Sequence, residues 1–135
     1  MIKKTFTIDM YSYYKIHVIV AEDFDAAIKK YCKGLNVDIE HTTAMFLCNQ
    51  YIHFNGWILV RPNPATSTIA HEAFHATYKV MSDIGSGLDG ESEEPFAYLL
   101  GYITDMVVQT LLAYDKKYPA VEESEEIAIK EPNNN

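Results

Sequence analysis

The order of apolar and polar positions in the first half of the chain is typical of β-strands. Four segments are rich in β-branched and aromatic residues: 4–10, 14–20, 42–49 and 51–61. The first two are separated by only a few residues and are expected to pair as a hairpin. In the last segment, Asn55-Gly56 is a dipeptide typical of a tight turn, which would split it into two short antiparallel strands, 50–54 and 57–61.

Three further segments are predicted to be helices. They run from Asp23 to about Lys33, from Thr66 or Ser67 to about Ser82, and from Ser92 to about Leu112 or Tyr114. Each begins at a residue whose side chain can accept a hydrogen bond from the first turn, and Gly34 is suited to end the first helix. Apolar residues recur at helical spacing in the two later helices and are expected in the core: Phe74, Tyr78, Met81, Leu99, Leu100, Ile103 and Met106.

This order of elements predicts an α+β fold, with a small, mostly antiparallel sheet followed by two long helices. The length of 135 residues suits one domain, which we place at residues 1–119. Residues 120–135 hold a cluster of glutamates and few side chains that a core would bury, so they are expected to form an acidic, disordered tail.

Charge and composition narrow the range of functions. The formal net charge of −8 comes with no basic stripe, so nucleic acid is not an expected partner. No run approaches the roughly 18 to 20 apolar residues of a membrane span. Asp9, Lys15 and His17 interrupt any apolar segment of a signal peptide, so we expect a cytoplasmic protein. Cys32 and Cys48 lack metal-finger spacing and are expected to be reduced thiols.

The segment HEAFH at residues 71–75 carries the strongest chemical signal in the chain. His71 and His75 are four residues apart on a predicted helix, so both imidazoles project from one face and can bind one metal ion. Glu72 lies beside them, where a carboxylate can contact a water at the metal without being a ligand. The pattern predicts a catalytic site that holds one Zn²⁺ per chain.

A catalytic zinc site needs a third protein ligand and leaves a fourth position open. We predict that Glu94, in the first turn of the next helix, is this ligand. The glycine-rich loop at residues 83–90 would let the chain reverse and bring Glu94 to the two histidines. Glu93 and Glu91 are the alternatives, in which case Glu94 serves only as a favourable charge at the helix start.

With Glu94 included, the residues resemble the gluzincin class of zinc metallopeptidases, in which HExxH precedes a glutamate ligand on a second helix. Eighteen residues lie between His75 and Glu94, which is similar to the aminopeptidase branch of the class. The segment 94–97, Glu-Pro-Phe-Ala, is also similar to the ligand-bearing Glu-Gly-Phe-Ala segment found there. The resemblance covers residues 66–102 and implies a zincin-like fold. In overall size the chain resembles the minimal metallopeptidase-like proteins of bacteria and phages.

One position departs from the pattern of that class. Other gluzincins carry an aspartate four residues after the glutamate ligand, where it orients the first histidine, but this chain has Tyr98 there. Asp105, on the same face of the predicted helix as Glu94, is the substitute we expect. Tyr98 and Tyr102 are candidates to stabilise an oxyanion during peptide hydrolysis.

The function expected from these residues is zinc-dependent hydrolysis of a peptide or protein substrate, with Glu72 as the general base. An extended substrate could add to the edge of the strand that ends near Arg61. The alternative is a catalytically weak or inactive protein that keeps the metal and the fold as an interaction module. Three other histidines are expected to lie outside the site: His17, His41 and His53.

Overall fold

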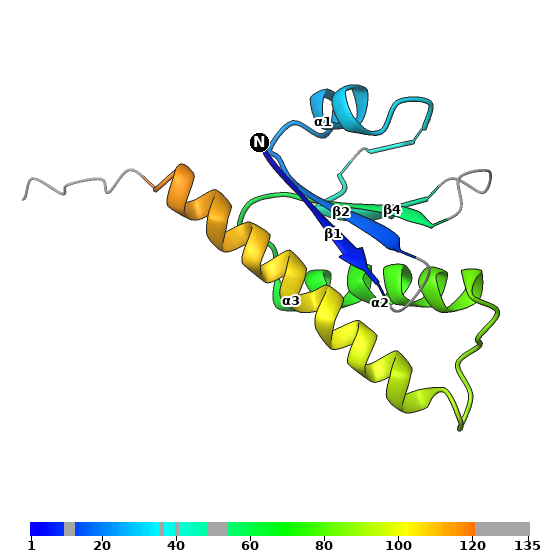
Figure 1. The fold of residues 1–135 in the computed structure, drawn as a ribbon. Helices are drawn as coiled ribbons and strands as arrows, with labels where there is room; N and C mark the ends of the chain where they lie inside the picture. Colours follow the sequence, from blue (N-terminus) through cyan, green and yellow to red (C-terminus); the bar gives the residue numbers. More distant parts are fainter. Residues whose placement is uncertain (10–12, 36, 40, 49–53, 121–135) are drawn as a thin grey trace, which may run out of the picture.

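The computed structural model describes residues 1–9, 13–35, 37–39, 41–48 and 54–120, and within them the chain forms four strands and three helices (Figure 1). In chain order the elements are β1 (Ile2–Ile8), β2 (Tyr14–Val20), α1 (Phe24–Tyr31), β3 (Ala44–Leu47), β4 (Asn55–Val60), α2 (Thr66–Asp83) and α3 (Glu93–Lys117). The predicted α+β class is confirmed.

The four strands form one mixed sheet in the order β1-β2-β4-β3. β1 is antiparallel to β2, as the predicted hairpin requires, and β3 is antiparallel to β4. β2 and β4 run parallel, which requires a crossover connection, and here α1 and β3 both lie within that connection. The expected sheet does precede the two long helices, and two of its three strand pairings are antiparallel, but the parallel pairing of β2 with β4 was not predicted.

Asn55 and Gly56 do not form a turn, and the turn prediction is wrong. They are the first two residues of β4, where Gly56 pairs with Ile16 of β2. A Cβ atom at Gly56 would lie 2.6 Å from Cε2 of Phe46, which is too close for two carbon atoms. A glycine is therefore required here, because the Phe46 ring packs directly against the backbone of β4. Most of the short strand expected at 50–54 lies outside the described residues.

The strand that ends near Arg61 has no open edge. β4 pairs with β2 on one side and with β3 on the other, so the expected addition of a peptide along this strand is wrong. The Arg61 side chain instead joins neighbouring segments, because its Nε donates to the Thr42 carbonyl at 3.0 Å and its guanidinium lies 4.7 Å from the centre of the Phe24 ring. Among the described strands, the open edges belong to β1 and β3.

Helices cover both faces of the sheet (Figure 1). α2 and α3 lie on one face, where the larger core contains Ile16, Val18, Val20, Ile58, Val60, Ala73, Ala76, Ile103 and Met106. α1 lies on the other face, over a smaller core of Ile19, Ala21, Phe24, Ala27, Cys32, Leu47 and Leu59. Alternate residues of β2 and β4 enter the two cores, and burial of each large apolar side chain contributes about 1.5 to 3 kcal/mol.

The predicted cap of the first helix is confirmed, and that of the second is wrong. Asp23 caps α1 as expected, since its Oδ1 accepts a hydrogen bond from the Ala26 amide at 2.9 Å. α2 begins at Thr66 with Ala65 in the cap position, so capping by Thr66 or Ser67 is wrong. Its first turn has no side-chain cap.

α3 is longer than predicted and ends at Lys117. Ser92 occupies the cap position as expected, but its Oγ accepts from the Asp89 amide at 2.9 Å and does not bond to the first turn of the helix. Of the helices in the described ranges, only α3 is long and apolar enough to cross a membrane by length and composition. Its buried residues, among them Ile103 and Val107, pack in the protein core. Core helices of soluble proteins can have the same length and composition.

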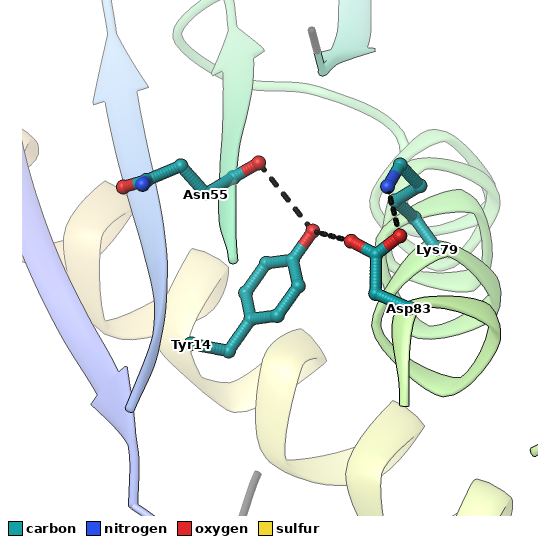
Figure 2. A network of polar contacts seen from close by, with 4 residues as sticks. All are labelled: Tyr14, Asn55, Lys79 and Asp83. Carbon is teal, nitrogen blue, oxygen red and sulfur yellow. Dashed lines mark hydrogen bonds and ion pairs between the residues drawn. The ribbon is translucent and has the colours of Figure 1, made fainter. Parts of the chain in front are cut away.

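A polar network ties β2 to the last turn of α2 (Figure 2). The fully buried Tyr14 donates its hydroxyl hydrogen to Oδ2 of Asp83 at 3.0 Å, and the Asn55 carbonyl lies 3.4 Å from the same hydroxyl. Lys79 forms an ion pair with Oδ1 of Asp83. Each oxygen of the Asp83 carboxylate thus has a hydrogen-bond donor, which offsets the cost of covering it.

Candidate metal centre

The two histidines of the HEAFH segment meet on the exposed side of α2. Their Nε2 atoms lie 3.0 Å apart, and the ring centres are separated by 4.6 Å with the rings 78° apart. Two imidazoles that bind one zinc ion at about 2.0 to 2.1 Å in tetrahedral geometry place their nitrogens about 3.3 Å apart. The donor pair therefore fits a shared ion after a shift of a few tenths of an ångström.

Glu72 lies next to this pair on the inner side of α2. The residue is only 8% exposed, and in the described part of the chain no hydrogen-bond donor reaches its carboxylate. Every fully covered side-chain oxygen among the described residues has a hydrogen-bond partner, so the Glu72 oxygens must retain contact with solvent. The side chain is mostly covered, and its carboxylate has no hydrogen-bond donor among the described residues, so it can accept a proton from a water that reaches it.

Glu94 lies elsewhere. It lines a pocket with the end of β1, and no third His, Cys, Asp or Glu of the described ranges groups with the two histidines as a metal site would require. The rotation of α3 explains this. Phe96 packs against Phe74 of α2 with ring centres 5.5 Å apart, and at about 100° per residue Glu94 lies about 200° away from Phe96 around the helix.

The same rotation places Glu93 closer to α2. Glu93 precedes Phe96 by three residues, which corresponds to an offset of about 60° around the helix. Its side chain is exposed, and the smaller offset from Phe96 places its backbone position nearer to α2 than that of Glu94. Of the carboxylates considered from the sequence, Glu94 remains a prediction, and Glu93 is the one that the rotation of α3 favours.

The residues expected to support the site lie on the outer face of α3. Asp105 follows Glu94 by eleven residues, which returns it to the same side of the helix, and it is exposed. Each of the two site histidines bonds only to the other within the described ranges. Tyr98 and Tyr102 are 77% and 46% exposed and line the pocket of Glu94. Within the described part of the chain, neither Asp105 nor these tyrosines form a hydrogen bond or a ring contact with the imidazoles.

An aromatic strip beside the histidines was not anticipated from the sequence. Phe74 and Tyr78 were expected in the core, but they are 41% and 56% exposed and stack with ring centres 6.5 Å apart. Phe74 also lies 6.5 Å from the ring of His75. Helical spacing predicted that both rings belong to the core. They are exposed because, of the two, only Phe74 packs on α3, where its ring contacts Phe96.

The other histidines lie apart from the pair. His17 of β2 hydrogen bonds through Nδ1 to Thr5 at 2.9 Å and through Nε2 to the Asn55 side chain at 3.3 Å, and it stacks on Trp57. Burial is the main reason that the pKa of His17 is lowered. His41 is exposed with a φ of 61°, and His53 lies outside the described residues.

Comparison of the chain with protein-family models, with curated proteins and with solved structures gives no match. Two converging imidazoles can bind a borderline-soft cation such as zinc, and a neighbouring carboxylate without a hydrogen-bond donor among the described residues can accept a proton beside it.

Proposed function

We propose that the protein is a zinc-dependent peptidase with its active site on α2. The observation that carries the proposal is the approach of the His71 and His75 Nε2 atoms to 3.0 Å, with Glu72 next to His71 in the helix and its carboxylate without a hydrogen-bond donor among the described residues. A purely structural metal site has no use for a neighbouring carboxylate that is neither a ligand nor hydrogen bonded. This combination supports catalysis over a structural role for the metal.

A carboxylate from the first turn of α3 completes the ligand set. The spacing after HEAFH favours Glu94, and the rotation of α3 favours Glu93. Removing each carboxylate in turn distinguishes Glu93 from Glu94 as the third ligand. The Glu93→Gln and Glu94→Gln variants are compared for zinc affinity, and the true ligand is the one whose loss weakens binding by about tenfold or more.

Each residue then has a defined task. The two histidines and the α3 carboxylate would hold zinc, and a bound zinc would supply a water of lowered pKa and a Lewis acid for the substrate carbonyl. Glu72 accepts the proton of that water and returns it to the leaving amine. The packed stem of Glu72 fixes its carboxylate relative to His71, because the two residues are adjacent on one rigid helix.

The substrate is an extended peptide that adds to β3. This strand is at the edge of the sheet, pairs with β4 on one side, and lies against α2. Backbone hydrogen bonds to an open edge hold a peptide without requiring a given sequence, so the specificity would depend on side-chain contacts. Phe74 and Tyr78, exposed beside His75, offer such contacts to an apolar side chain of the substrate.

A second function, metal binding without turnover, is favoured by one observation. No third ligand of the described ranges groups with the histidine pair, as an assembled catalytic site would require. In this alternative the metal and the exposed aromatic strip would serve an interaction with a partner protein.

The Glu72→Gln variant tests the proposal. Zinc per chain is measured by elemental analysis, and cleavage is measured with a pooled peptide library and mass spectrometry. We expect about one zinc per chain in both proteins and a loss of about 10²-fold or more in kcat for the variant. The matched control is Asp115→Asn, which removes one charge from the exposed far end of α3.

Two outcomes contradict the proposal. If the Glu72→Gln variant binds zinc and cleaves peptides as the parent does, Glu72 is not the base. If the parent holds far less than one zinc per chain and gains none on reconstitution, the metal centre itself is wrong.

A further inference from the structure

A pocket of about 640 Å³ lies between the end of β1 and the first half of α3. Its floor is apolar, because the buried side chains of Ile8 and Leu99 line it and Pro95 adds a further apolar wall. The volume falls in the range of about 300 to 1,000 Å³ that is typical of sites for small organic ligands. Neither of the two site histidines lines it.

The rim of the pocket is aromatic and acidic. Tyr98 and Tyr102 contribute two exposed side chains, one turn apart on α3. Asp9 and Glu94 contribute two carboxylates, one from the end of β1 and one from the first turn of α3. The lining residues include no Lys, Arg or His among the described part of the chain. The electrostatic preference of the pocket is therefore for a positive charge.

We propose that this pocket binds an organic cation: an ammonium or guanidinium group carried on an apolar stem. The stem would lie on the floor formed by Ile8 and Leu99, and the cation would meet the rim carboxylates and the faces of the tyrosine rings. This site goes beyond the peptidase function, because its contacts involve neither the histidine pair nor Glu72, and Glu94 is the one residue that it shares with the two candidates for the third zinc ligand.

Two competing occupants are disfavoured by charge. A free anion would be repelled by both rim carboxylates. The glutamate-rich segment 121–135 of the chain carries the same sign of charge as the rim, so it is not suited to cover the pocket. The N-terminus of α3 by itself disfavours a cation, and Glu93 and Glu94 in its first turn offset that field.

The binding test uses matched pairs of ligands that differ in charge. Phenethylamine is compared with the neutral 2-phenylethanol, and N-acetylarginine amide is compared with its uncharged citrulline counterpart, by NMR titration. We expect the charged member of at least one pair to bind about threefold to tenfold more tightly. Preference for phenethylamine indicates a free amine as the natural ligand, and preference for the arginine compound indicates a basic side chain of a peptide. Equal binding within both pairs overturns the proposal.

Variants then locate the site. Asp9→Asn, Glu94→Gln and Tyr98→Ala should each weaken binding of the charged ligand by about twofold to fivefold, because each removes one exposed contact with the cation. Asp115→Asn is the control: it makes the same change in net charge about 30 Å away from Glu94 along α3 and should leave the affinity unchanged. An equal loss in the control would show only a general attraction to an acidic protein, and the proposal would fail.

The same titrations separate this site from the metal centre. The His75→Ala variant should lose zinc binding and keep its affinity for the amine. If saturating zinc abolishes amine binding to the parent protein, Glu94 serves the metal and the separate pocket is refuted, while the peptidase proposal stands.

Discussion

Replacement of Tyr14 by phenylalanine tests the network that joins β2 to α2. The change removes one hydroxyl from a fully buried ring and leaves the ring itself in place. A hydrogen bond to a charged group contributes about 1.5 to 3 kcal/mol to the free energy of unfolding. Lys79 continues to pair with Asp83 in the variant, so the carboxylate is not left alone and the lower half of that range, about 1.5 to 2 kcal/mol, applies.

The expected loss is visible in both chemical and thermal unfolding. For a domain of this size, about 1 kcal/mol corresponds to roughly 4 °C in Tm, so the Tyr14→Phe variant should melt about 6 to 8 °C lower. Tyr13→Phe is the matched control, because it removes a hydroxyl from the adjacent residue, whose side chain is 70% exposed, and should change Tm by less than about 2 °C. A Tyr14→Phe variant as stable as the parent protein would refute the account of the network.

Alkaline pH gives an independent check on the same bond. Burial, and after it the Asp83 carboxylate, raises the pKa of Tyr14 above its ordinary value of 10.0. Above pH 10 the phenol ionises in the unfolded chain but stays protonated in the folded protein. The unfolded state then binds fewer protons, and the free energy of unfolding falls as pH rises, by up to about 1.4 kcal/mol per pH unit. The phenylalanine variant should lose this contribution and show a shallower decline above pH 10.

Two further predictions concern the sheet. Gly56→Ala should destabilise the protein by about 1 to 3 kcal/mol in urea unfolding, because the new Cβ would meet the Phe46 ring. In a Phe46→Leu background the same change should cost less stability, and strictly additive effects of the two substitutions would contradict this packing. Burial, reinforced by the nearby charges of Lys3 and Lys15, lowers the pKa of His17 below 6.5, so the unfolded state binds more protons just below pH 6.5 and stability should rise with pH up to that value. A His17→Gln variant should show a flatter dependence over that interval, and an unchanged slope would count against it.

The elements of the fold were largely predictable because each depends on local sequence. The hairpin of β1 and β2, the cap at Asp23 and the extent of α2 to within one residue of Ser82 all follow from side chains that lie close together in the chain. The parallel pairing of β2 with β4 was not predictable, since it joins segments separated by α1 and β3. The turn predicted at Asn55-Gly56 was wrong for a related reason: glycine is required at position 56 by the Phe46 ring, which comes from another strand.

In the candidate site, too, only the part that depends on local sequence was predictable. The approach of His71 and His75 is a property of one helix, and their spacing of four residues was enough to predict it. Whether a carboxylate of α3 reaches them depends on how that helix is rotated against α2. The contact of Phe96 with Phe74 fixes the rotation, and a spacing counted along the chain carries no information about it.

The mixed sheet also has a consequence for the order of folding. Partners in the β1–β2 hairpin are as close as Ile8 and Tyr14, whereas Lys15 of β2 pairs with Asn55 of β4, forty residues away. Closing the longer loop costs more chain entropy, so the hairpin should form early and β4 with the edge strand β3 should join late. A chain emerging from the ribosome would therefore complete the β3–β4 edge only after the whole segment through Val60, with α1 inside it, is available.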